Sequence, residues 1–149
     1  MIRVNNICSE LQFVDCAVLK LDISNGLMGL RTDDNYDLRL KFEPLYDGII
    51  SDRLCGRLRL SVDLVVTRDE ETDEKVNVSA ILEGAFDAEK TSMSEDDFKR
   101  MVAINGGAAL YGMARGKIEA MSGLIFSTGK ITLPYVNVLE YYRQAEEGE

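Results

Sequence analysis

Four segments in the first half of the chain alternate apolar and polar residues with a period of two, and this pattern constrains the fold more than any other feature. Successive side chains of a strand point to opposite faces of a sheet, so each segment is predicted to turn an apolar face to a core and a polar face to water. One covered face is typical of an antiparallel sheet. The segments are 11–23, in which Asp15 is the exception, 36–43, 57–66 and 76–86.

The stretches between these segments carry loop and turn residues. Residues 24–35 are rich in Gly, Asn and Asp, residues 67–75 are polar and acidic, and Asp47-Gly48 is predicted to form a turn. These connections agree with four separate strands. Four strands followed by a long helix predict an α+β domain with a four-stranded antiparallel sheet.

A long helix is predicted to begin after Ser94, which is a candidate N-cap with Asp97 three residues later. Acidic residues at 95–97 suit the positive end of the helix dipole. Bulky residues then recur at helical spacing, and we expect this face to cover the apolar side of the sheet. Its members are Phe98, Val102, Leu110, Ala114, Ile118, Met121 and Ile125.

The opposite side of this helix carries a small-residue face made of Ala108, Gly112 and Gly116. A glycine inside a helix costs about 1 kcal/mol relative to alanine, and close approach of another backbone usually offsets that cost. We therefore expect this face to pack on a helix of a second copy. The alternative is a helix that breaks at the glycine pair Gly106-Gly107.

Regular structure is expected to stop after the long helix, because glycines and Pro134 interrupt an apolar segment. A short C-terminal helix is predicted to start at Val138. The whole chain, 1–149, is interpreted as one domain, with residues 1–10 and 145–149 loosely ordered.

Composition narrows the function classes. The formal net charge is −9 and no basic patch occurs, which argues against nucleic-acid partners. No apolar run is long enough for membrane insertion, and the start does not look like a signal peptide. Three scattered cysteines without a C-x-x-C pair fit reduced thiols in a cytoplasmic protein.

No catalytic, cofactor-binding or metal-binding constellation is predicted. The chain has no histidine, so histidine-based triads and histidine metal sites are ruled out. The glycine-rich run 105–112 does not fit G-x-G-x-x-G, and Ser127-Thr128-Gly129-Lys130 lacks the spacing of a P-loop. The acidic run 69–74 lacks the spacing of an EF-hand and is interpreted as a solvated loop tip.

Three local motifs resemble the SecB family of export chaperones. Residues 82–86, Leu-Glu-Gly-Ala-Phe, resemble the end of the family's last strand. The helix signature N-G-x-x-x-L-[FY]-P-Y-x-R and the loop motif L-x-P-V-N-F are each matched in part. The chain departs from these motifs at Gly112-Met113, Tyr135 and Val138. The matching residues are Asn105, Gly106, Leu110, Tyr111 and Arg115 in the helix, and Leu133, Val136 and Asn137 in the loop.

The resemblance implies a homotetramer, built as a dimer of dimers with the long helices layered between sheets. It also implies an ATP-independent chaperone that binds unfolded polypeptides in apolar grooves near the loop and the last helix. The clients would be held for export, with SecA as the possible recipient, or for a dedicated partner such as an antitoxin. Flexible apolar grooves bind many sequences without reading them.

Eight apolar or aromatic side chains are the candidate groove residues, because they lie in or beside the irregular segment. Two alternatives remain: an oligomeric interaction module of the same fold without general client binding, and a small-ligand binder or enzyme that uses the same groove. The candidate residues are Met121, Leu124, Phe126, Ile131, Leu133, Tyr135, Tyr141 and Tyr142.

Overall fold

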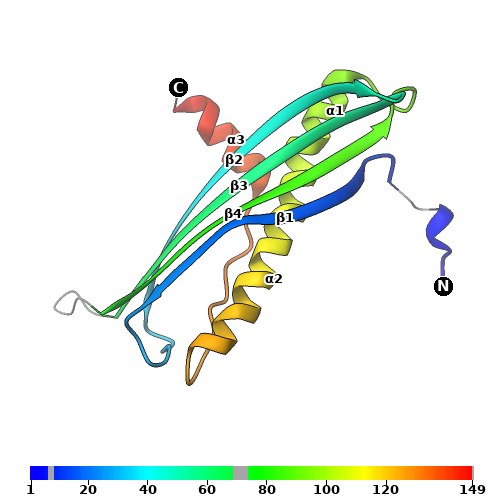
Figure 1. The fold of residues 1–149 in the computed structure, drawn as a ribbon. Coiled ribbons are helices and arrows are strands. Elements are labelled where there is room, and N and C mark those ends of the chain that lie inside the picture. Colours follow the sequence, from blue (N-terminus) through cyan, green and yellow to red (C-terminus); the bar gives the residue numbers. More distant parts are fainter. Residues whose placement is uncertain (7–8, 69–73, 149) are drawn as a thin grey trace.

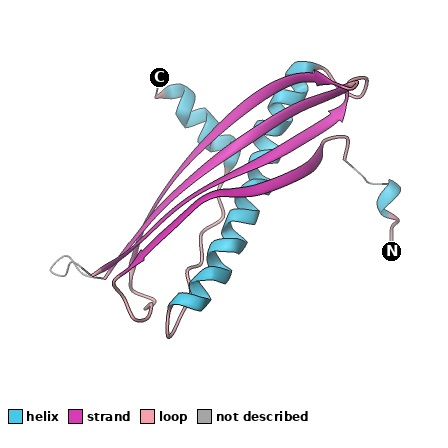
Figure 2. Ribbon diagram, in the orientation of Figure 1, coloured by secondary structure: helices cyan, strands magenta, loops and turns pink. Residues whose placement is uncertain are grey.

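The computed structural model describes residues 1–6, 9–68 and 74–148. A four-stranded antiparallel sheet, in the order β1-β4-β3-β2, lies against a long helical segment, and a short helix lies beside β2 (Figure 1 and Figure 2). This arrangement confirms the predicted α+β fold. The elements are η1 (Val4–Asn6), β1 (Gln12–Asn25), β2 (Asn35–Ile50), β3 (Arg53–Thr67), β4 (Lys75–Glu89), α1 (Glu95–Met101), the π-helical turn η2 (Val102–Gly106), α2 (Gly107–Ile125) and α3 (Val138–Glu147).

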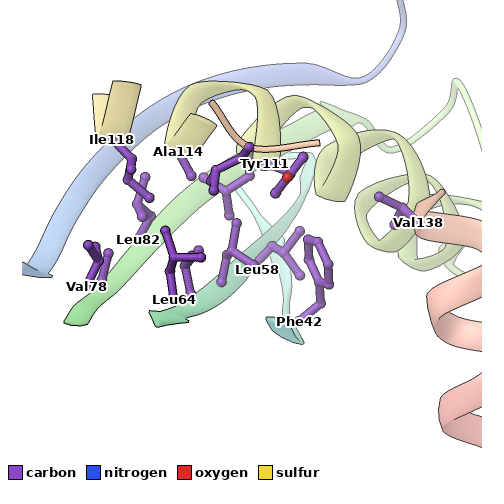
Figure 3. Packing of buried hydrophobic residues seen from close by; sticks show 14 of the residues in the cluster. Phe42, Leu58, Leu64, Val78, Leu82, Tyr111, Ala114, Ile118 and Val138 are labelled. Carbon is purple, nitrogen blue, oxygen red and sulfur yellow. The ribbon is translucent and has the colours of Figure 1, made fainter. Parts of the chain in front are cut away.

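The core lies between the sheet and the long helical segment (Figure 3). In β3 and β4 the even-numbered residues are buried without interruption, as period-two alternation requires. The predicted bulky helix face meets them: Phe98, Leu110 and Ala114 are at most 1% exposed. The prediction that this face covers the sheet is confirmed.

The β2–β3 connection differs from the prediction. Asp47-Gly48 is not the turn: β2 continues through it to Ile50, with a bulge between Tyr46 and Gly48, and φ of Gly48 is +97°. The chain reverses at Ser51 and Asp52, whose φ values are 50° and 62°. Two consecutive residues with positive φ make the type I′ hairpin turn that matches strand twist. The sequence signal was misleading because Asp-Gly also suits a bulge.

Register shifts in β1 explain why Asp15 interrupts its alternation. The pairing with β4 shifts between Phe13 and Asp15, and again between Val18 and Lys20. Paired residues of adjacent strands share a face, so the first shift moves Cys16 and Val18 onto the helix-covered side. The predicted apolar face of this strand was therefore partly wrong: Ala17 pairs with Glu83 on the open side.

The long helical segment is continuous. Ser94 caps it, because its hydroxyl accepts a hydrogen bond of 3.1 Å from the backbone N–H of Asp97. The alternative of a break at the glycine pair is wrong: the π-helical turn carries the chain from Met101 into α2. Such a turn inserts one extra residue and shifts the helix face.

At Gly106 and Gly107 the sheet and α3 both approach the long helical segment closely. A Cβ at Gly106 would lie 2.9 Å from Cζ of Phe86 on the sheet, and a Cβ at Gly107 would lie 2.9 Å from Cγ1 of Val138 on α3. Neither distance leaves room for a methyl group. The pair is thus required by packing on two sides of the helix.

Replacing Gly106 by alanine is expected to destabilise the protein by about 1–3 kcal/mol, because the added methyl group overpacks the contact with Phe86. Urea unfolding measures the change. Gly123→Ala is the matched control, since nothing lies within 4 Å of the added Cβ in that part of α2. Equal stability of the two variants would contradict the packing role.

Short helical elements lie close to both chain ends. Asn137 caps α3 by accepting a 3.0 Å hydrogen bond from the N–H of Glu140. The helix continues through Glu147, so residues 145–147 are helical, and Arg143 pairs with Glu140 and Glu147 along one side. At the other end, Val4–Asn6 forms a short 3-10 turn.

A buried ion pair holds the loop between β1 and β2. Arg68 donates to both carboxylate oxygens of Asp34, at 3.0 and 3.1 Å, and to the carbonyl of Gly29 at 2.7 Å. The Asp34 side chain is fully buried. Its hydrogen bonds from Arg68, and from the N–H of Arg31, hold the pKa of Asp34 below its usual range.

We expect Asp34→Asn to destabilise the fold near neutral pH and to have little effect in acid. A lowered folded-state pKa stabilises the fold above the unfolded pKa of about 4, and this stabilisation is lost as pH falls through the folded-state pKa. Urea unfolding across pH checks this, with the exposed Asp33→Asn as control. A stability difference that does not shrink below about pH 4 would contradict the assignment.

Candidate functional site

An open apolar groove lies between β1 and α2, with a volume of ≈ 350 Å³. We call it the β1–α2 groove. Its lining is almost entirely aliphatic, and Lys117 is the charged residue in it. It therefore offers contact surface and few polar groups that would select one ligand. The other lining residues are Val18 and Leu21 of β1, Ala80 and Leu82 of β4, and Ala114, Ile118, Ala120 and Met121 of α2.

Strand β1 extends this apolar surface beyond the groove. Val14 and Leu19 are 59% and 50% exposed, and Val18 and Leu21 of the groove wall are also exposed. The alternation read from the sequence placed Leu19 and Leu21 on the core-facing side of this segment and missed their exposure. The available signal was that Val14 and Val18 sit at positions that the alternation reserves for polar residues.

Of the eight candidate groove residues, Phe126, Ile131 and Leu133 belong to the core of the protomer. Ile131 and Leu133 are each 1% exposed. The segment returns along α2, where the hydroxyl of Ser122 accepts a 2.8 Å hydrogen bond from the N–H of Ile131. This return path turns the apolar side chains inward, so in this structure they offer no surface to a ligand.

Leu124 and Tyr135 are each 89% exposed, and Tyr135 is held in place from α2. The Tyr111 hydroxyl donates to the carbonyl of Pro134 at 2.5 Å, and Nε of Arg115 donates to the carbonyl of Leu133 at 2.6 Å. The Arg115 guanidinium also lies 4.4 Å from the Tyr135 ring centroid, in a cation–π contact. An exposed aromatic ring on a fixed backbone is a preorganised contact point.

Tyr141 and Tyr142, the remaining aromatic candidates, are half-buried where α3 meets β2. The backbone N–H of Phe42 donates to the Tyr141 hydroxyl at 3.1 Å, and the two rings pack edge to face at 4.9 Å. The Tyr142 hydroxyl is buried and has no hydrogen-bond partner among the described residues. Its burial, followed by the nearby Tyr141, raises the pKa of Tyr142.

The small-residue face, Ala108, Gly112 and Gly116, is exposed on the protomer. Nothing in the described protomer lies within 4 Å of a Cβ placed at either glycine. Unlike Gly106, these two glycines are not required by packing inside the protomer. They leave a smooth helix surface that another backbone can approach closely.

Among the described residues, no group of three or more potential metal ligands gathers in one place. The helices in the described part of the chain are all too short or too polar to span a membrane.

Comparison with solved structures identifies the fold. The chain matches the Rv1957 SecB-like chaperone of Mycobacterium tuberculosis, in complex with a ChAD peptide from the Rv1956 HigA1 antitoxin, with a TM-score of 0.62 and 18% identity. The match covers 89% of this chain and 94% of that one. A protein of unknown function from Streptococcus agalactiae matches with a TM-score of 0.46 and 10% identity, over 85% and 98% of the two chains.

No family model matches the sequence. No curated protein matches it either. The structural match nevertheless covers most of both chains, so the fold is SecB-like, as the sequence motifs implied.

Proposed function

We propose that this protein is a molecular chaperone that binds unfolded polypeptides through exposed apolar surface. The observation that carries the proposal is the β1–α2 groove, whose lining is aliphatic and open to solvent on a SecB-like fold. Exposed Leu124 and Tyr135 add contact points near the same helix. Unfolded chains expose apolar segments, and burying them gains about 25 cal/mol per Å².

Holding a client in this way requires no nucleotide, because burial of apolar surface alone supplies the free energy. The proposed chaperone is therefore ATP-independent. The scattered cysteines of the chain support the proposal that it acts in the cytoplasm. The client is held for export, with SecA as one recipient, or for a dedicated partner. The structural neighbour binds a peptide from an antitoxin, which supports a dedicated partner as a use of this fold.

The proposed assembly is a homotetramer, a dimer of dimers in which the small-residue face packs on a helix of another copy. Its exposure in the protomer supports this arrangement, because glycines that lack a packing role would otherwise weaken the helix by about 1 kcal/mol each. An oligomer would also place several apolar grooves within reach of one long client, which strengthens binding.

The client-binding proposal predicts tight binding of a labelled, reduced and unfolded protein and no binding of its native form. Tyr135→Ala and Leu124→Ala are each expected to weaken binding about fivefold, the factor for ~1 kcal/mol of lost apolar contact. Fluorescence anisotropy measures the affinities. Ile50→Ser is the control, an exposed apolar residue at the β2–β3 hairpin. Absence of binding would leave the alternative, an interaction module of the same fold without general client binding.

The assembly proposal predicts that Gly112→Leu yields smaller species with an unchanged far-ultraviolet circular dichroism spectrum, because a bulky side chain on the small-residue face keeps a second helix away. Light scattering coupled to size-exclusion chromatography measures the mass. Met113→Leu, which places a leucine on the exposed residue about 100° around α2 from Gly112, is the control and is expected to leave the wild-type mass unchanged. A wild-type protein that is monomeric at micromolar concentration would overturn the tetramer.

A further inference from the structure

Strand β2 forms one outer edge of the sheet, and its edge-facing backbone groups can be identified. The N–H of Phe42 points away from β3, because it donates to Tyr141 on α3. Backbone groups of a strand alternate between its two sides, so Leu38 and Leu40 also present their N–H and C=O groups outward. Among the described elements no strand pairs with this edge. Pro44, two residues beyond Phe42, faces the same edge but has no backbone N–H.

Helix α3 lies beside β2 (Figure 1) and contacts this edge at Phe42. The hydrogen bond between the N–H of Phe42 and the Tyr141 hydroxyl is the polar contact there. The neighbouring Tyr142 hydroxyl loses its hydration without gaining a partner among the described residues, which makes the covered state less favourable. Leu139 on α3 remains 59% exposed. The Tyr141 and Tyr142 rings do pack against Phe42, so the weak points of the cover are the buried Tyr142 hydroxyl and the exposed Leu139.

The other side of α3 is also open. A groove of ≈ 550 Å³ separates it from the end of α1 and the π-helical turn, with Arg100, Ile104 and Tyr142 in its lining. The helix thus has space beside it rather than close packing.

The chain leading into α3 is anchored just before the helix. Arg115 and Tyr111 hold the carbonyls of Leu133 and Pro134, while Tyr135 beyond them is exposed. Val136 is also packed against the core, so a hinge that moves α3 without disturbing the anchored segment lies at Asn137, the N-cap of the helix. The apolar anchor of the helix itself is Val138, which packs beside Gly107.

We propose that α3 is a displaceable cover of the β2 edge, and that an extended segment of the client takes its place by pairing with β2. This inference rests on the proposed chaperone function and names what the site recognises: the main chain of an unfolded polypeptide. Strand addition supplies affinity through backbone hydrogen bonds that are the same for every sequence. Side chains at alternate positions of the segment would lie beside Leu38, Leu40 and Phe42 on the covered face. Extended segments with alternating apolar residues and no proline are the expected ligands.

The exchange replaces one side-chain hydrogen bond by several backbone hydrogen bonds and returns the Tyr142 hydroxyl to water. A ligand that binds only the open state has an apparent affinity set by the fraction of molecules in that state. Changes that weaken the cover must therefore raise client affinity, and changes that strengthen it must lower client affinity.

Two adjacent tyrosines test this with the same chemical change and opposite expected signs. Tyr141→Phe leaves the N–H of Phe42 without its acceptor, so client affinity is expected to rise about fivefold. Tyr142→Phe removes a buried hydroxyl without a partner, so client affinity is expected to fall about fivefold. Tyr46→Phe, whose ring lies against Phe98 and Lys99 rather than α3, is the control. Changes of the same sign, or no change in either variant, would overturn the proposal.

Amide hydrogen exchange with a bound unfolded client gives the second readout. The amides of Leu38, Leu40 and Phe42 are expected to gain protection while those of α3 lose it. A client that binds without these changes overturns the strand exchange alone and leaves the chaperone proposal standing. Absence of binding by the wild type overturns both proposals, so the two failures are distinguishable.

Discussion

The architecture depends on close contact at Gly106 and Gly107. The sheet reaches the helix through Phe86, and α3 reaches it from the other side through Val138. A side chain at either glycine would hold one layer away, and the buried apolar contacts between the layers would open. The π-helical turn sits at the same place and shifts the helix face between α1 and α2.

The glycines of this helix serve two different purposes. Side chains of the protomer occupy the space beside Gly106 and Gly107, whereas Gly112 and Gly116 face open space. The same residue type therefore marks intramolecular packing at one pair and an unpartnered surface at the other. That difference separates what stabilises the protomer from what we propose for assembly. The two sheet edges also differ: α3 contacts β2 through Tyr141, while β1 lines the β1–α2 groove.

Much of the fold was predictable because it follows from local patterns. The alternation in β3 and β4, the Ser94 cap and the bulky face of the helix all have a sequence period or a capping rule behind them. The turn at Ser51-Asp52 and the β1 register shifts were missed, since both depend on pairing with another strand. For the candidate site, exposed Tyr135 and Leu124 were named, but the sequence did not distinguish them from the buried Ile131 and Leu133.

The sequence by itself determined the element order, the apolar faces of β3, β4 and the long helix, and the motifs that resemble SecB, because periodicity and capping are properties of neighbouring residues. Only the tertiary structure decided which apolar residues remain at the surface. A side chain such as Leu133 is buried because a distant helix holds its carbonyl through Arg115, whereas Val18 is exposed because it lies on an edge strand. Exposure is a property of the whole chain packed together, and it distinguishes a core from a binding surface.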